Sequence, residues 1–160
     1  MNPLGWLIGL LLPACGFGGA GGVKVPQPMD FAHIEFPSTP NAALVGPAGM
    51  QPAPHIVTPV YPVAAPVLQA ALREVAAGQR GVFPLAAYPE RGQMFWVARS
   101  AVFNFPDVVA AEIRPVTPGE SSLVLYSRSL YGSSDLGVNR QRLVAWIAAL
   151  DRRLAGAPRN

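Results

Sequence analysis

The sequence predicts an α+β fold in two layers, with two helices packed on one face of an antiparallel sheet of four or five strands. Three observations support it: a helical apolar periodicity near the C-terminus, a second one in mid-chain, and consecutive β-prone runs between them. Strands joined by short turns pair antiparallel, and helices with one apolar stripe cover one face of such a sheet. The expected order is strand, helix, four strands, helix.

The expected domain covers residues 55–155 and begins with a strand and a helix. Residues 55–61 are rich in β-branched residues but contain a proline, which is typical of an edge strand. Pro66 lies near the start of the next segment and Gly78 at its end, as in many helices. Between them one helical face is apolar, with Val67, Leu68, Ala71, Leu72 and Val75.

Four β-prone runs follow the first helix. Residues 82–88 and 93–103 are separated by Pro-Glu-Arg-Gly, a loop of hairpin length. Residues 108–116 resume the β pattern after a break at residues 104–107, and a turn leads into residues 121–130. These four runs are expected to pair as neighbours in the sheet.

The last element is an amphipathic helix, and its pattern is the clearest in the chain. Ser134 or Asp135 can cap its start, and Arg152 and Arg153 suit the negative end of its dipole. The apolar stripe has the spacing i, i+3, i+4, i+7 and i+11, with Leu143, Trp146, Ile147, Leu150 and Leu154.

Residues 24–54 form a proline-rich strap or linker. The prolines at 26, 28, 37, 40, 47, 52 and 54 are too many for interior strands or helices. Apolar residues such as Phe31, Ile34 and Phe36 nevertheless favour partial packing on the domain.

Residues 1–23 carry no charged side chain and include a short apolar run, which predicts a signal or membrane-anchor segment. Three interpretations are open. Cys15 is a lipidation candidate if residues 12–15 are a lipoprotein cleavage box. The segment is otherwise an uncleaved span or a cleaved signal peptide. We expect membrane attachment, in the bacterial cell envelope and on the periplasmic face.

Composition and charge argue against several functions. The formal net charge is +3, but Lys24 is the only lysine and the arginines are scattered, so no basic stripe suits nucleic acid. No phosphate-cradling glycine loop or Cys/His cluster is visible. Asp107 and Asp135 alone offer too few ligands for a metal, and we expect neither a metal nor another cofactor.

A polar cluster is expected where the last strand meets the last helix. Ser127 and Ser129 continue the strand face of Leu123 and Leu125, so an apolar face turns polar toward its end. The next polar residues have the spacing of a helical stripe that Trp146 continues, and they are Asp135, Asn139 and Arg142. These side chains should face the sheet, where buried charge needs partners.

Arg140 and Arg142 lie in the first turns of this helix, where the dipole disfavours cations. An internal network with Asp107 or Asp135 is the expected compensation, and an anion bound at the helix start is the alternative. The full predicted cluster comprises Arg99, Asp107, Ser127, Arg128, Ser129, Asp135, Asn139 and Arg142.

The same region resembles the domain-of-unknown-function family 1499, a bacterial and plastid family. The resemblance covers roughly residues 30–150 and rests on Ser127-Arg128-Ser129, Gly132, the Ser-Asp-Leu-Gly-Val-Asn string at 134–139, Arg142, and Phe105-Pro106-Asp107 after Arg99. A looser match includes Ser38, Pro40 and Asn41. The resemblance implies an N-terminal membrane segment in many members, and no established activity.

The sequence favours a membrane-tethered accessory domain, a non-enzymatic binding or structural module with an unknown protein or small-molecule partner. The alternative is a hydrolase or transferase that acts on an anionic substrate at the region from Ser127 to Asp135. Its weakness is the lack of a base, because His33 and His55 lie far from these serines in the sequence.

Overall fold

The computed structural model describes residues 17–156. Its helices and strands, in chain order, are β1 (Ala42–Pro47), β2 (Ile56–Thr58), α2 (Ala65–Ala77), β3 (Val82–Tyr88), the 3-10 turn η2 (Pro89–Arg91), β4 (Gln93–Arg99), β5 (Pro106–Thr117), β6 (Glu120–Ser129) and α3 (Val138–Ala155). The α+β class, both predicted helices and the four consecutive strands are confirmed.

The sheet differs in detail from the prediction. It has six strands in the order β2-β1-β6-β5-β4-β3, rather than four or five. The consecutive strands β3 to β6 pair antiparallel as expected, and β1 pairs antiparallel with β6. The edge strand β2 lies parallel to β1, so the sheet is mixed and the all-antiparallel prediction is wrong at this edge.

The additional strand, β1, comes from the proline-rich segment. The expectation that prolines keep residues 24–54 out of the sheet interior is wrong for Ala42–Pro47, which lies between β6 and β2. The reason is local spacing. Pro40 precedes the strand and Pro47 ends it, so the residues between them keep the backbone N–H groups that an interior strand needs.

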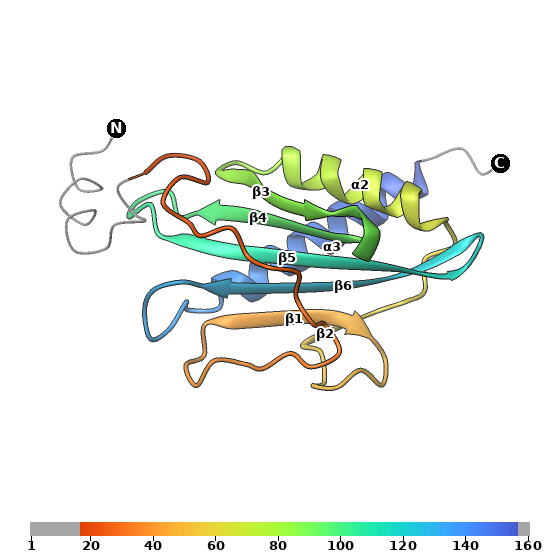
Figure 1. Ribbon diagram of the computed structural model, residues 1–160, viewed down its shortest axis with the longest axis horizontal. Helices are drawn as coiled ribbons and strands as arrows, with labels where there is room; N and C mark the ends of the chain where they lie inside the picture. Colours follow the sequence, from red (N-terminus) through yellow and green to blue (C-terminus); the bar gives the residue numbers. More distant parts are fainter. Residues whose placement is uncertain (1–16, 157–160) are drawn as a thin grey trace.

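Both helices cover one face of the sheet, as predicted, and lie behind it in Figure 1. Strand alternation sends Trp96 and Leu125 to this face, where they meet Leu72 and Leu150 of the helices. Trp96 and Trp146 stand edge to face, with ring centroids 5.5 Å apart. This core joins α2, α3 and the sheet, and it fixes the start of α3 against the strand ends.

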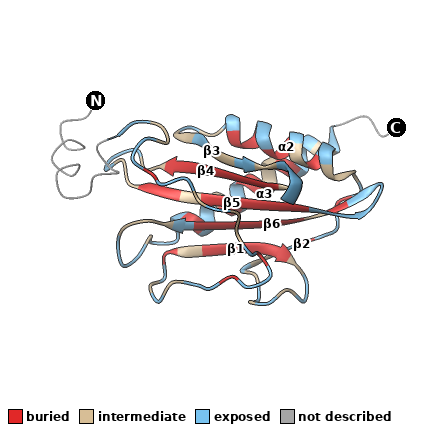
Figure 2. Ribbon diagram, in the orientation of Figure 1, coloured by how far each residue is buried: buried red, intermediate tan, exposed pale blue. Residues whose placement is uncertain are grey.

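The other face is crossed by residues 17–40, which we call the cover segment (Figure 1). Phe31 and Ile34 are buried in a second apolar cluster with Phe95 and Tyr126, so the predicted packing of this segment is confirmed. The centres of β1, β4, β5 and β6 are accordingly buried on both faces, as their red colour in Figure 2 shows.

Side chains from the strands hold the cover segment in place. The Gln93 side-chain amide makes the pair of hydrogen bonds that a neighbouring strand would make with the Met29 backbone. Its Oε1 accepts from the Met29 N–H at 2.9 Å and its Nε2 donates to the Met29 carbonyl at 2.7 Å. The Tyr88 hydroxyl donates to the Pro26 carbonyl at 2.6 Å. Arg99 donates to the carbonyls of Gly19 and Gly21. The segment is therefore fixed at several points along the sheet.

Candidate functional site

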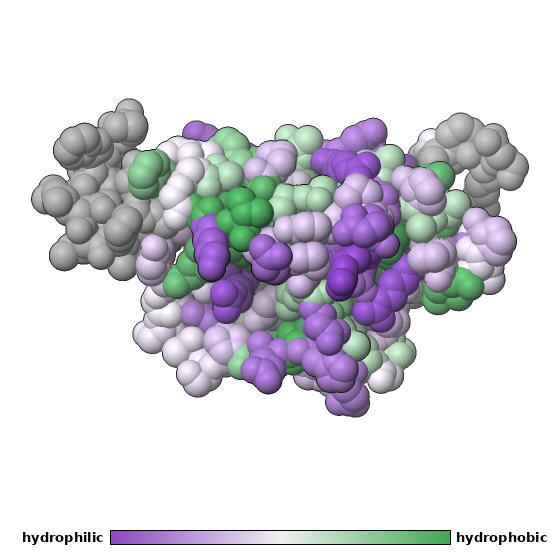
Figure 3. Space-filling model, viewed as in Figure 1, coloured by the Kyte–Doolittle hydropathy of each residue, from purple (hydrophilic) through white to green (hydrophobic). Residues whose placement is uncertain are grey.

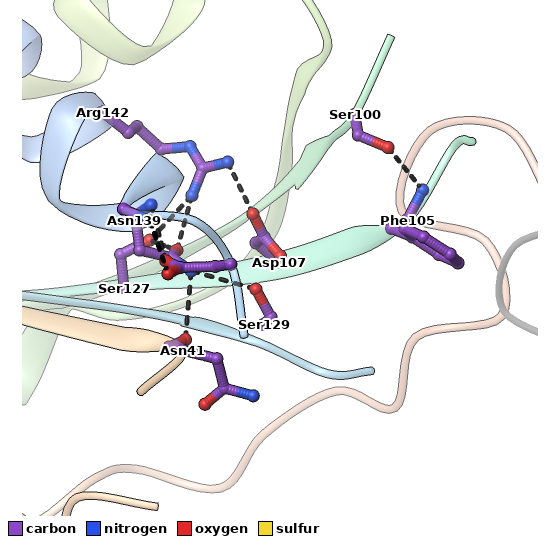
Figure 4. Close-up of polar contacts among 10 residues, drawn as sticks. Asn41, Ser100, Phe105, Asp107, Ser127, Ser129, Asn139 and Arg142 are labelled. Atoms are coloured by element: carbon purple, nitrogen blue, oxygen red, sulfur yellow. Dashed lines mark hydrogen bonds and ion pairs between the residues drawn. The ribbon is translucent and has the colours of Figure 1, made fainter. Parts of the chain in front are cut away.

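Four element ends meet at one corner of the helix-covered face. The end of β6 lies between the start of β1 and the start of β5, because Ala43 pairs with Ser127 and Asp107 pairs with Ser129. The start of α3 packs over this corner (Figure 4). The predicted change of the β6 face from apolar to polar occurs here, and Ser127 is fully buried.

Asn139 is the centre of a buried hydrogen-bond network, and its exposed fraction is 0%. Its Nδ2 donates to the Asn41 carbonyl at 3.1 Å, to Ser129 Oγ at 3.0 Å and to Asp135 Oδ2 at 2.8 Å. One amide group thus joins β1, β6 and the loop before α3. We call these residues, with Asp107, Ser127 and Arg142, the Asn139 network.

The acceptor side of the Asn139 network joins the helix to two strands. Asn139 Oδ1 accepts from Ser127 Oγ at 2.5 Å and from Arg142 Nη1 at 2.6 Å. Arg142 also donates from Nη1 to Ser127 Oγ at 3.0 Å, and from Nη2 to Asp107 Oδ2 at 2.6 Å. Its side chain is 13% exposed and that of Asp107 is 9% exposed, so this ion pair is largely removed from water.

The sequence predicted Ser134 or Asp135 as the N-cap of α3, but Gly137 occupies the N-cap position. Asp135, two residues earlier, nevertheless binds the start of the helix. It precedes the helix, and its carboxylate accepts the backbone N–H groups of Gly137 and Asn139, both at 2.9 Å. Partial burial opposes ionisation of Asp135, but the hydrogen bonds from the Asn139 and Gly137 amides and the Asn139 side chain outweigh it and lower its pKa. The carboxylate at the helix start also offsets the positive end of the dipole.

This lowered pKa predicts a pH dependence of stability. The ionised Asp135 carboxylate stabilises the fold fully at pH values above its pKa in the unfolded chain, which is about 3.9. This contribution is lost as the pH falls through the lower pKa of Asp135 in the folded chain. The free energy of unfolding, measured by urea titration at a series of acidic pH values, should fall less steeply in Asp135→Asn than in the natural chain. Identical pH dependences in the two chains would contradict this stabilising role of the Asp135 carboxylate at the helix start.

Asn41 belongs to the network, although sequence reasoning did not place it among the site residues. It is 5% exposed, its Nδ2 donates to the Gly132 carbonyl at 2.9 Å, and its carbonyl accepts from the Ser129 N–H at 2.9 Å. It therefore holds the loop after β6 to the start of β1. The only sequence signal for this role was the looser family match that included it.

Two predicted members lie elsewhere. Arg128 alternates with Ser127 and Ser129, so it faces the opposite side of β6, toward the cover segment. Arg99 ends β4 and holds the cover segment and the carbonyl of Asn104. In Figure 4 the loop contact between Ser100 and Phe105 is separate from the Asn139 network, and it shapes the turn that precedes Asp107.

A cavity of about 530 Å³ lies outside the helix start. The sequence placed the alternative enzymatic site at the region from Ser127 to Asp135, and the end of this region, Ser134 and Asp135, lines the cavity. Its lining includes Ser134, Asp135, Arg140 and His55. The His55 Nδ1 accepts the Leu44 N–H at 3.0 Å. This leaves its proton on Nε2 in the neutral ring, so neither nitrogen offers a free lone pair to a serine. The arrangement does not form the serine and histidine pair that nucleophilic catalysis needs.

A second feature with room for a ligand lies between the cover segment and the sheet, and we call it the cover groove. It has a volume of about 530 Å³ and is lined by the segment on one side and by β4, β5 and β6 on the other. Figure 3 shows apolar and hydrophilic residues side by side on this face. Sequence periodicity gave no signal for this groove.

The N-terminal predictions lie mostly outside the described residues. The lipidation candidate Cys15 belongs to residues 1–16, which the structure does not describe. Within residues 17–156 no helix is long and apolar enough to cross a membrane.

The fold and the network define a small α+β domain in which a two-helix layer is fastened to a mixed six-stranded sheet by buried polar side chains. Residues 35–150 match the family described as a protein of unknown function, DUF1499, and the chain belongs to this family. The family resemblance predicted from the motif residues is thus confirmed. A search of the curated proteins finds no match.

Proposed function

We propose that the chain is a membrane-tethered accessory domain of the bacterial cell envelope, a non-enzymatic binding module that uses the cover groove as its binding site. One observation supports this above the others. The Ser127, Ser129, Asp135, Asn139 and Arg142 side chains bond to one another and to neighbouring strands, whereas the groove has room for a ligand.

The polar contacts of the network support a structural role for it. A catalytic serine needs a base that accepts its proton, but Ser127 Oγ donates to the Asn139 amide oxygen, which is a weak base. The Arg142 guanidinium pairs with Asp107 and does not face open solvent. The network thus holds the helix start to the sheet and keeps the domain rigid behind the groove.

The apolar run in residues 1–16, which carry no charged side chain, supports the membrane tether, because such a run is typical of a signal or membrane-anchor segment. Mass spectrometry of the mature chain from a membrane fraction tests this part. A lipid-modified Cys15 or an intact Met1 in that fraction is the expected result, and either defines the attachment. A soluble periplasmic chain cleaved near residue 23 would contradict it.

The second candidate is a hydrolase or transferase that acts on an anionic substrate at the region from Ser127 to Asp135. It is favoured only by the presence of Ser134 and His55 around one cavity. A fluorophosphonate probe, which reacts with activated serines, separates the two functions. We expect no more labelling of Ser134 in the folded chain than in the denatured chain. Labelling of Ser134 that requires folding and is lost in His55→Gln would overturn the binding-module proposal.

A further inference from the structure

The cover groove combines an apolar floor with a charged rim. Phe95, Val108 and Ala110 contribute the floor from adjacent strands, and Val23 and Leu130 line it at one end. Its volume of about 530 Å³ lies in the range of small-ligand sites. Such a lining suits a hydrocarbon chain, because burying apolar surface is the main driving force for binding at a site of this kind.

The charges around the groove are unequal. Lys24, the only lysine of the chain, and Arg128 line it, against the single carboxylate of Glu35. In the part of the chain that the structure describes, the ion pairs involve other residues and leave both cations without a carboxylate partner. The excess of one positive charge favours a ligand with an anionic group.

An unpaired hydroxyl belongs to one of the residues that line the groove. Tyr126 lines it and is 5% exposed, and among residues 17–156 its hydroxyl has no hydrogen-bond partner. Buried hydroxyls are normally paired, and an unpaired one is costly. Burial raises the pKa of Tyr126, against the opposing charge of Arg128, so the hydroxyl keeps its proton and can donate to an acceptor.

We propose that the cover groove binds the anion of a single-chain fatty acid, with the hydrocarbon chain over Phe95, Val108 and Ala110 and the carboxylate at Lys24 and Arg128. The inference rests on the proposed function, in which this groove is the binding site. It specifies a free fatty acid because the groove has the size of a small-ligand site, and because a carboxylate matches the excess positive charge of the rim.

Photolabelling of the full chain tests the assignment. The chain in phosphatidylcholine vesicles is exposed to a diazirine derivative of decanoic acid, and the labelled peptides are identified by mass spectrometry. We expect label on the cover segment and on β5 or β6 near the groove. Unlabelled carboxylates should compete with an affinity, referred to their free aqueous concentration, that rises roughly threefold to fourfold for each methylene until the groove is filled. Decanoate should compete about fivefold better than decanol.

Two variants separate the groove from nonspecific labelling. Lys24→Gln with Arg128→Gln should weaken competition by decanoate about fivefold and leave decanol unchanged. As a control, Arg80→Gln with Arg152→Gln removes the same charge from exposed positions that do not line the groove. This control should change competition by neither decanoate nor decanol. Val108→Phe, which fills the floor, should abolish groove labelling, and circular dichroism confirms that each variant is folded.

The outcomes also distinguish this inference from the proposed function. If decanol equals decanoate and the charge variants have no effect, while Val108→Phe still abolishes labelling, the groove binds ligands but the carboxylate assignment is wrong. If label lies outside the groove or is insensitive to Val108→Phe, the groove is not the binding site, and both proposals fail.

Discussion

Replacement of Arg142 by methionine should destabilise the protein by about 3–5 kcal/mol, the largest effect expected for a single change in the Asn139 network. Methionine retains most of the packing volume but removes the guanidinium, and the Asp107 carboxylate remains in place with its side chain only 9% exposed. A buried carboxylate without its partner is strongly unfavourable. Ser127 and Asn139 also lose a donor.

The measurement is the free energy of unfolding of the full chain in urea, followed by the fluorescence of the buried Trp96 and Trp146. Arg140 provides the matched control, because it lies on the same helix and is exposed. Arg140→Met should change stability by less than about 0.5 kcal/mol. Equal effects of the two substitutions would mean that Arg142 acts only through the general charge of the helix.

Replacement of Asn139 by alanine is the second large effect, and we expect a loss of about 2–4 kcal/mol. The side chain is fully buried and makes hydrogen bonds to Asn41, Ser127, Ser129, Asp135 and Arg142. Its removal leaves the buried Ser127 hydroxyl without its acceptor and opens a polar cavity. The same urea titration reports the loss.

Amide hydrogen exchange adds a local measurement for Asn139→Ala. Asn139 joins the helix start to β1 and β6, so exchange should accelerate in residues 130–142 before it does in the core of α3. Arg140→Ala is the control and should leave this region protected. Exchange that rises uniformly through the chain would argue against a local fastening role.

Much of the fold followed from periodicity. The stripe that includes Leu143 and Leu150 predicted α3, and β-prone runs joined by short turns predicted β3 to β6. The inward direction of the network was also readable, because Ser127 lies on the strand face of Leu125 and Asn139 lies on the helix face of Trp146. Local patterns determine these features, so the sequence alone was sufficient.

Alternation also explains one misplaced residue. Arg128 was grouped with Ser127 and Ser129 as one string of the family resemblance, yet successive residues of a strand face opposite sides. Strict use of the two-residue period would have assigned Arg128 to the other face. Arg99 is similar, because Phe95, Val97 and Arg99 share the face that the cover segment crosses.

The remaining features depend on contacts between distant segments. The placement of β1 next to β6 brings Asn41 to Asn139, which lies 98 residues further along the chain. The cover groove forms because a segment without regular secondary structure crosses the sheet and is held by Gln93 and Tyr88. Neither the pairing of β1 with β6 nor the packing of the cover segment on the sheet has a local sequence pattern. The prolines around β1 indicate a loop instead.

The most direct test of the structural role of the network is the coupling between Asp107 and Arg142 in a double-mutant cycle. The free energies of unfolding of Asp107→Asn, Arg142→Met and the double variant are compared with that of the natural chain. Because the two groups form a buried ion pair, the double variant should lose less free energy of unfolding than the two single variants lose together. The expected difference is about 1.5 kcal/mol or more. If the losses of the two single variants add up to the loss of the double variant within about 0.5 kcal/mol, the structural role of this ion pair is contradicted.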